Sequence, residues 1–157
     1  MKHLLGLFFK FQKDLYCIAK MKIKNENDIE DIIQETMLSA YTNLKNLKNN
    51  KFFKTWIIRI LLNNCKKFYK RKNFKSLDDK DGIEKIPTNE IDLATIEFEN
   101  FISFLPEEER TILTLYYSLN YTTKEIAQIL QKREGTICSK ISRAKVKIKE
   151  KYKGEFY

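Results

Sequence analysis

The chain has 157 residues, enough for one ordinary domain or two small ones, and its 30 Lys/Arg against 21 Asp/Glu give a formal net charge of +9 at pH 7. Hydrophobic residues make up 43% of it, which supports a packed core, while four glycines and two prolines leave long stretches free of helix breakers. No apolar run is long enough to span a bilayer, and the N-terminal "HLLGLFF" is followed by lysines without a small-residue cleavage site. We therefore expect a cytoplasmic protein without membrane insertion.

The cysteine and histidine content argues against metal and nucleophile chemistry. Cys17, Cys65 and Cys138 are far apart and form no C-x-x-C pair, and His3 is the only histidine. A zinc site or a Cys/His nucleophile needs partners that this sequence does not contain. We expect no metal, no cofactor and no catalytic residue, and we interpret the cysteines as buried or half-buried small hydrophobic side chains.

Charge is unevenly distributed along the chain. Residues 1–75 carry 17 Lys/Arg against 6 Asp/Glu, residues 76–109 carry 2 against 11, and residues 110–157 carry 11 against 4. A basic surface suggests a phosphate backbone or an anionic membrane as partner. Because no membrane-type amphipathic run accompanies the two basic parts, nucleic acid is favoured. A lysine-rich surface that only keeps the protein soluble is the alternative.

Three amphipathic helices are predicted in the first half, because apolar residues recur there at spacings of three and four. The first runs from about Leu4 to Lys20, with a stripe of Leu4, Leu7, Phe8, Phe11, Leu15 and Ile18. The second runs from Asp28 to Leu44, is capped by Asn27 or Asp28, and buries Ile29, Ile32, Ile33, Thr36, Met37, Ala40, Tyr41 and Leu44. The third runs from about Phe53 to Arg71, and its inward face is formed by Phe53, Trp56, Ile57, Ile60 and Leu61. Together they form a first domain, residues 1–73.

Acidic residues are concentrated on the second predicted helix, within "IEDIIQETMLSAY". Asp28, Asp31 and Glu35 are spaced i, i+3 and i+7, so they share a face turned away from the apolar stripe, with Gln34 beside them. Acids in the first turn complement the helix dipole, but Glu35 lies about two turns in, beyond the reach of that effect. The spacing therefore favours a cationic partner for this face.

The helical pattern stops at an acidic linker, residues 74–91, which includes "SLDDKDGIEKIPTNEI". A second domain, residues 92–157, begins with a helix formed by Leu93, Ile96, Phe98, Phe101, Ile102 and Leu105. Pro106, at the first helical position, then opens a further helix whose apolar face is Ile112, Leu113, Leu115, Tyr116 and Leu119.

The last part of the chain predicts a helix-turn-helix, in "YTTKEIAQILQKREGTICSKISRAKVKIKEK". Thr122 and Glu125 form a capping box before a short helix with Ile126, Ala127 and Leu130 inward. Gly135 lies in the turn, where a positive φ is cheap, and a second helix starts near Thr136 with Ile137, Ile141, Ala144 and Ile148 inward. Its opposite face presents Ser139, Lys140, Ser142, Arg143 and Lys147, which suit a DNA major groove. A solvated, lysine-rich terminal helix is the alternative.

The motifs "DIEDIIQETMLSAY", "FFKTWIIRILLNN" and "LPEEERTILTLYYSLNYTTKEIAQILQKREGTICSKISRAKVKIKE" occur in this order and resemble the second and fourth conserved regions of the extracytoplasmic-function (ECF) sigma factors. The resemblance covers roughly Leu15 to Lys149, apart from the linker. It implies an all-α fold of two small helical domains joined by a flexible acidic linker, and a non-catalytic function. The expected partners are the β′ coiled coil and β flap of core RNA polymerase and the −10 and −35 elements of promoter DNA, which the protein helps to open.

The resemblance also implies roles for individual residues. Those expected to bind polymerase are Asp28, Asp31, Gln34 and Glu35. Those expected to bind the −10 element, beginning with a specificity loop at residues 46–51, are Asn46, Asn49, Asn50, Lys51, Lys54, Arg59, Asn63, Lys66, Lys67, Lys70 and Arg71. Those expected to bind the −35 element are Thr136, Cys138, Ser139, Lys140, Ser142, Arg143 and Lys147. Trp56 either stacks at the fork of the opened DNA or packs in the core.

Some residues depart from the family pattern and keep alternatives open. Leu62 and Cys138 stand where family members often carry a basic residue, and Lys140 replaces the commoner arginine, which loses bidentate guanine recognition. The alternatives are a stand-alone helix-turn-helix regulator and a sigma-like adaptor that does not open DNA. A nuclease would need clustered carboxylates for metal, which the sequence does not offer. An anti-sigma factor is the usual further partner in the family.

Overall fold

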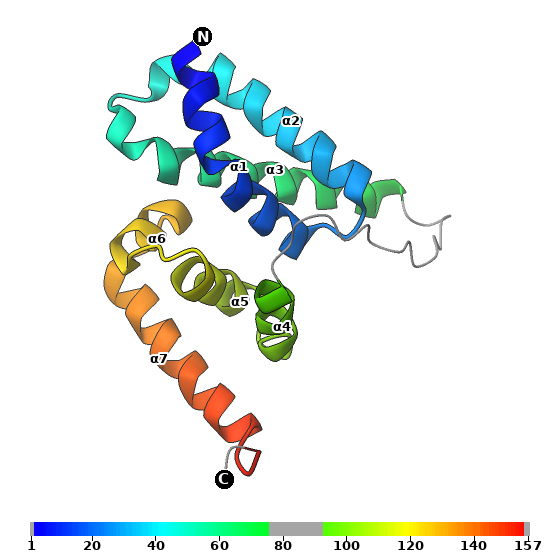
Figure 1. Ribbon diagram of the computed structural model, residues 1–157, viewed down its shortest axis with the longest axis vertical. Helices are drawn as coiled ribbons and strands as arrows, with labels where there is room; N and C mark the ends of the chain where they lie inside the picture. The colour runs from blue at the N-terminus through cyan, green and yellow to red at the C-terminus, as the bar shows by residue number, and fades with distance from the viewer. Residues whose placement is uncertain (1, 76–92, 156–157) are drawn as a thin grey trace. The chain divides into compact units, whose positions relative to one another are not determined.

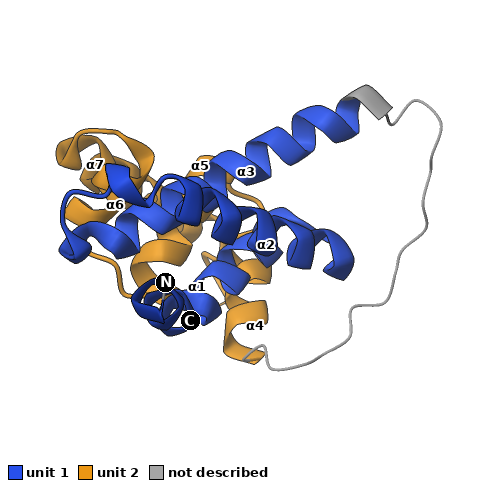
Figure 2. Cartoon of the chain, turned by 90° about the horizontal axis from the view of Figure 1, so that it is seen from above, with its two compact units in different colours: residues 1–89 blue, residues 90–157 orange. Residues whose placement is uncertain are grey.

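The computed structural model describes residues 2–75 and 93–155, and the regular structure in both ranges is helical (Figure 1). The chain divides into two compact units, residues 1–89 and 90–157 (Figure 2). The all-α fold expected from the sequence is confirmed. Residues 76–91 of the predicted linker lie outside the described residues.

The first unit is a bundle of three helices, α1 (Lys2–Lys22), α2 (Glu26–Thr42) and α3 (Phe53–Lys75), each packed against the other two. Two short 3₁₀ turns, Leu44–Asn46 and Asn50–Phe52, connect α2 to α3. The predicted apolar stripes supply the core, whose fully buried members include Leu15, Ile18, Ile29, Ile32, Phe53, Ile57 and Leu61. Removing these side chains from water is what holds the bundle together.

A buried polar pair joins α2 to α3 inside this core. The Thr36 hydroxyl donates to the backbone carbonyl of Ile32 at 2.7 Å and accepts from the Asn64 side-chain amide at 3.1 Å. Both side chains are almost completely removed from solvent. Because a buried polar group without a partner is costly, this pair fixes how α3 lies along α2.

The structure corrects three details of the sequence reading in this unit. The cap of α2 is Asn25, whose side chain accepts from the backbone N–H groups of Asn27 and Asp28, so the predicted caps were wrong. The helix α3 continues to Lys75, four residues past the expected helix end at Arg71. Tyr41 is 55% exposed, because it is one residue past the buried Ala40 and so leaves α2 in a different direction, away from the core.

The second unit contains α4 (Leu93–Phe101), α5 (Glu107–Leu113), a π-helical turn (Thr114–Ser118), α6 (Thr123–Leu130) and α7 (Glu134–Lys151). Both α5 and α6 pack against α7. The buried side chains include Leu105, Ile112, Leu115, Tyr121, Ile126, Ile137, Ile141 and Ala144. The sequence therefore placed the inward face of the last helix correctly as far as Ala144.

The start of the helix-turn-helix follows the sequence closely, whereas its turn does not. The capping box is present: the Thr122 hydroxyl accepts from the Glu125 N–H at 3.1 Å, and the Glu125 carboxylate accepts from the Thr122 N–H at 3.2 Å. The positive φ of the turn belongs to Gln131, at 55°, and not to Gly135. Gly135 lies in the first turn of α7, which begins earlier than predicted, at Glu134. At a helix end, a residue other than glycine can adopt the left-handed conformation at modest cost in free energy.

Two further features bear on the sequence expectations. Pro106 is the N-cap of α5 and not its first helical residue. Cys65 is buried and Cys17 half-buried as expected, but Cys138 is exposed. Within residues 2–75 and 93–155, no helix is long and apolar enough to cross a membrane, and no group of three potential metal ligands comes together.

Candidate functional site

The outward side of α3 is a basic face, made by residues that recur at spacings of three and four: Arg59, Asn63, Lys66, Lys67 and Lys70. Arg59 is half-buried and the other four are exposed. From residue 66 to residue 73 only Phe68 is half-buried, and the remaining side chains are exposed. A run of cations on a rigid helix with free access to solvent is suited to the backbone of a nucleic acid.

Trp56 lies at the N-terminal end of the basic face. It is three residues before Arg59 and seven before Asn63, so the three side chains leave α3 on the same side. Its ring is half-buried and packs against Phe53, with the ring centroids 5.8 Å apart. One part of the indole therefore supports the core, and another part is open to solvent beside the basic face.

Two further residues were predicted to bind the same DNA, and neither belongs to the centre of the basic face. Lys54 is half-buried on another side of α3. Arg71 donates to both carboxylate oxygens of Glu35 on α2, each at 3.3 Å. This ion pair joins a predicted DNA contact to a predicted polymerase contact. Both side chains are substantially exposed, and such surface pairs contribute about 0–1 kcal/mol, so a partner can replace either member.

The loop of residues 46–51 has its predicted amide side chains at the surface. Asn46, Asn49, Asn50 and Lys51 are all exposed. The Asn49 side chain accepts from the backbone N–H of Lys51 at 2.9 Å and so shapes the second 3₁₀ turn. The Asn50 amide nitrogen lies 3.1 Å from Nε2 of His3, which ties the loop to the start of α1. Asn49 and Asn50 therefore hold the loop in place as well as presenting polar atoms.

The four residues of α2 that were predicted to contact polymerase differ in their exposure to solvent. Asp31 and Gln34 are exposed, whereas Asp28 and Glu35 are half-buried. The exposed pair continues into Leu38, 67% exposed, and Tyr41, 55% exposed. We call Asp31, Gln34, Leu38 and Tyr41 the outer stripe of α2.

The sequence analysis missed the apolar half of this outer stripe. It left Leu38 out and assigned Tyr41 to the core. The signal was present as a second periodic series, 31–34–38–41, on the side of α2 away from the buried series 29–32–36–40. Large apolar side chains exposed beside an acid and an amide are typical of a protein-binding surface.

On α7, part of the predicted DNA-binding set forms an exposed reading face. Ser139, Ser142 and Arg143 are exposed, on the side away from the buried Ile137 and Ile141. Cys138 is exposed at the margin of this face, and Thr136 is half-buried. Short hydroxyl side chains with one guanidinium can approach base edges in a major groove.

Arg133 is an additional cation that the sequence analysis did not include. It occupies the N-cap position of α7 and is exposed. Since the N-terminal end of a recognition helix is the end that approaches the bases, a cation at this position can contact the adjoining phosphates. It was missed because the helix was expected to start near Thr136.

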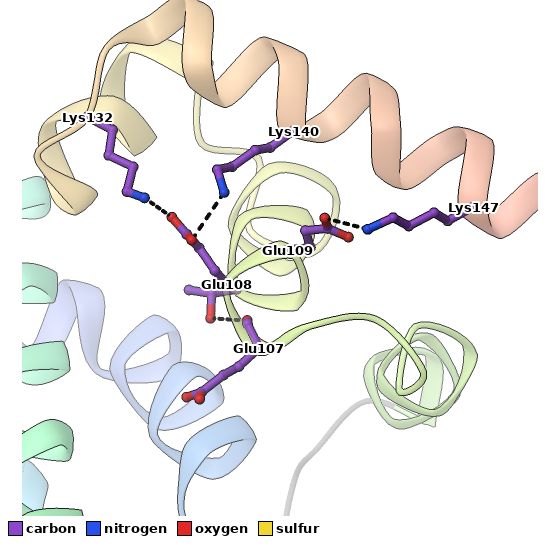
Figure 3. A network of polar contacts seen from close by, with 7 residues as sticks. Glu107, Glu108, Glu109, Lys132, Lys140 and Lys147 are labelled. Carbon is purple, nitrogen blue, oxygen red and sulfur yellow. Dashed lines mark hydrogen bonds and ion pairs between the residues drawn. The ribbon is translucent and has the colours of Figure 1, made fainter.

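The two remaining predicted DNA contacts, Lys140 and Lys147, are engaged inside the unit (Figure 3). Lys140 donates to the carboxylate of Glu108 at 3.2 Å, and Lys147 donates to that of Glu109 at 2.8 Å. Glu108 also forms an ion pair with Lys132. The hydrogen bond from Lys132, with that from Lys140, holds the pKa of the Glu108 carboxyl below its usual value. Both glutamates lie in the first turn of α5.

Comparison with known families matches both halves of the chain. The family model of sigma-70 region 2 matches residues 7–75, and that of sigma-70 region 4 matches residues 96–148. The chain is 27% identical to the ECF RNA polymerase sigma-E factor of Haemophilus influenzae, over 81% of this chain and 76% of that protein. It is also 27% identical to the RNA polymerase sigma factor SigV of Bacillus subtilis, over 85% of this chain and 81% of that protein.

Solved structures share the fold. The sigma factor RpoE in complex with the anti-sigma factor NepR from Bartonella quintana is similar with a TM-score of 0.72 and 22% identity, over 96% of each chain. The structure of CnrH in complex with the cytosolic domain of CnrY gives a TM-score of 0.71 and 19% identity, over 95% of this chain and 86% of that one.

Proposed function

The chain belongs to the extracytoplasmic-function sigma factors of the sigma-70 family, and from this premise we propose how its residues divide the work of transcription initiation. It is an alternative sigma factor, which binds core RNA polymerase, directs it to specific promoters and assists DNA opening. Sigma factors are non-enzymatic, DNA-binding initiation factors. We propose that this one likewise has no catalytic residue and acts in the cytoplasm.

The first part of the proposal concerns residues 1–73, which would bind polymerase and the −10 element. The outer stripe of α2 would dock on the β′ coiled coil, with Asp31 pairing with a cation and Leu38 and Tyr41 supplying apolar contact. The basic face of α3 would hold the backbone of the opened strand, and the loop of residues 46–51 would contact an extruded base. Trp56, half-buried beside the basic face, would stack at the edge of that strand.

The second part concerns residues 92–157, which would bind the −35 element through the reading face of α7. Ser139, Ser142 and Arg143 would contact the bases, and the exposed Arg133 would contact a phosphate. The single observation that carries the proposal is that each unit has its own exposed helix face suited to DNA, the basic face of α3 in one unit and the reading face of α7 in the other. Two such faces suit two promoter elements separated by a spacer.

The burial of Leu62 argues against the adaptor alternative. This residue stands where family members often carry a basic side chain, yet it is only 7% exposed. It therefore points into the core of the first unit, and the basic face of α3 keeps its cations without it. The stand-alone regulator would use α6 and α7 but would leave the outer stripe of α2 without a partner.

We further propose an anti-sigma factor as a regulatory partner. Two solved neighbours of this fold, RpoE and CnrH, are complexes, one with the anti-sigma factor NepR and the other with the cytosolic domain of CnrY. The exposed apolar residues of the outer stripe of α2 would be open to such a partner while polymerase is absent.

Site-specific photocrosslinking in the polymerase–promoter complex tests this division of residues. A photoreactive residue replaces Asn63 in one variant and Ser142 in another, both exposed, with the exposed Lys24 as the matched control position. We expect Asn63 to crosslink to the −10 strand, Ser142 to the −35 element, and Lys24 to neither. Crosslinks from Asn63 and Ser142 to one and the same element would contradict the proposal.

A further inference from the structure

The glutamates in the first turn of α5 bind lysines from the turn and from the second helix of the helix-turn-helix (Figure 3). Glu108 binds Lys132, which lies in the turn between α6 and α7, and Lys140, which lies within α7. Glu109 binds Lys147, two helical turns further along α7. Two adjacent carboxylates of α5 thus fasten α7 at two points along its length and the turn before it at a third.

Two of these ion pairs, Lys140–Glu108 and Lys147–Glu109, each have one member that is mostly removed from solvent. The side chain of Glu109 is only 11% exposed and that of Lys140 only 22% exposed, while their partners Lys147 and Glu108 are 46% and 38% exposed. By contrast, the members of the Arg71–Glu35 pair in the first unit are 61% and 41% exposed. Ion pairs that are partly removed from water are less screened by salt, so we expect the Lys140 and Lys147 pairs to be less sensitive to salt than the Arg71–Glu35 pair.

The geometry of α7 separates the fastened lysines from the reading face. Lys140 and Lys147 are seven residues apart and therefore leave the helix on the same side, toward α5. Ser139, Ser142 and Arg143 are exposed on the side away from the core. The lysines lie at the boundary between the packed side and the reading face, and their charges are already compensated by carboxylates.

We propose that Glu108 and Glu109 are positioning residues, which dock α7 onto α5 through Lys140 and Lys147 and thereby keep these two lysines out of the phosphate contacts of the second unit. The inference rests on the proposed function, in which the reading face of α7 binds DNA. It reduces the number of DNA contacts expected from the sequence. Arg143 contacts DNA, whereas Lys140 and Lys147 hold α7 against α5. Glu108 sets the angle at which the reading face is presented.

The salt dependence of DNA binding tests this assignment, because each cation that neutralises a duplex phosphate adds about 0.9 to the slope of log K against log [salt]. The full chain is titrated with fluorescent duplex DNA of mixed sequence, and thermal unfolding is followed by circular dichroism. We expect Arg143→Ala to lower the slope by about 0.9 without changing thermal stability. We expect Lys140→Ala to leave the slope unchanged and to lower the unfolding temperature.

The reverse experiment removes the carboxylate. Glu108→Gln removes the charged partner of Lys132 and Lys140, so the slope of log K against log [salt] should become steeper by about 0.9 or more. Adding Lys140→Ala to this variant should lower the slope again by about 0.9. If Lys140→Ala in the wild-type background lowers the slope as much as Arg143→Ala does, the inference is overturned while the proposed function stands. If neither substitution changes the slope, both the DNA-binding role of α7 and the inference fail.

Discussion

Replacing Lys66, Lys67 and Lys70 of α3 together by alanine is expected to remove most of the affinity of the polymerase complex for single-stranded promoter DNA. All three side chains are exposed on the basic face. Each phosphate contact with a single strand contributes about 0.7 to the slope of log K against log [salt], so the slope should fall by about 2. Fluorescence anisotropy of a labelled −10-strand oligonucleotide, titrated at several salt concentrations, measures this directly.

A control variant separates this local effect from the loss of three charges. Lys10, Lys13 and Lys24 are also exposed in the first unit, but they do not belong to the basic face of α3. Their replacement by alanine changes the net charge equally and should leave the slope nearly unchanged. Equal loss in the two triple variants would mean that the strand is attracted by the overall charge of the protein and that α3 has no special role.

Reversing the charge of Asp31 is expected to weaken binding to core RNA polymerase by about a hundredfold, since placing like charges together across an interface costs several kcal/mol. Asp31 is exposed and begins the outer stripe of α2, so the reversal does not disturb the core. The affinity of Asp31→Lys for core polymerase is measured by competition with fluorescently labelled wild-type protein.

Glu30→Lys is the matched control for this reversal, because it makes the same change of charge at the neighbouring residue. Glu30 is also exposed, but it lies at the edge of the outer stripe toward α1, where burial, and after it the charges of Glu26 and Glu30, raise the pKa of the Tyr16 hydroxyl. Its reversal should leave polymerase affinity within about threefold of wild type, as expected for a charge outside the contact. If Glu30→Lys and Asp31→Lys are equally impaired, the acids of α2 act only through net charge and the docking surface lies elsewhere.

The sequence was most informative for features that depend on one helix alone, such as its buried face and its cap. The series Ile29, Ile32 and Ile137, Ile141 identified the buried faces of α2 and α7, because periodicity depends only on helix geometry. The capping box of α6 was predicted because it joins side chains three residues apart to their own backbone. Both signals are local, and both were confirmed.

The sequence was least informative where the partner of a side chain comes from a distant segment. Lys140 has a spacing that suits a solvent-exposed face, and only the fold brings Glu108, 32 residues away, to its ammonium group. Arg71 and Glu35 were predicted to contact different partners, and the pattern gave no sign that they also bind each other. A helical pattern gives the direction in which a side chain leaves its helix but does not say which segment lies there.

Turn chemistry accounts for the remaining differences. Glycine is the usual residue where φ is positive, so Gly135 was the natural candidate in the second unit. The chain instead reverses at Gln131, where the backbone N–H of Lys132 bonds to the carbonyl of Ala127 at 3.0 Å. Once the turn is completed by that residue, Gly135 is free to join α7, and the reading helix starts earlier than predicted.

Reconstituted transcription tests the central claim most directly. Purified bacterial core RNA polymerase is combined with the chain and fragmented genomic DNA, and the 5′ ends of the transcripts are sequenced. We predict transcripts that depend on the chain and that start at a fixed distance from two shared short elements with a constant spacer. If the folded chain co-elutes with core polymerase but yields no such transcripts, it does not act as a sigma factor with that polymerase.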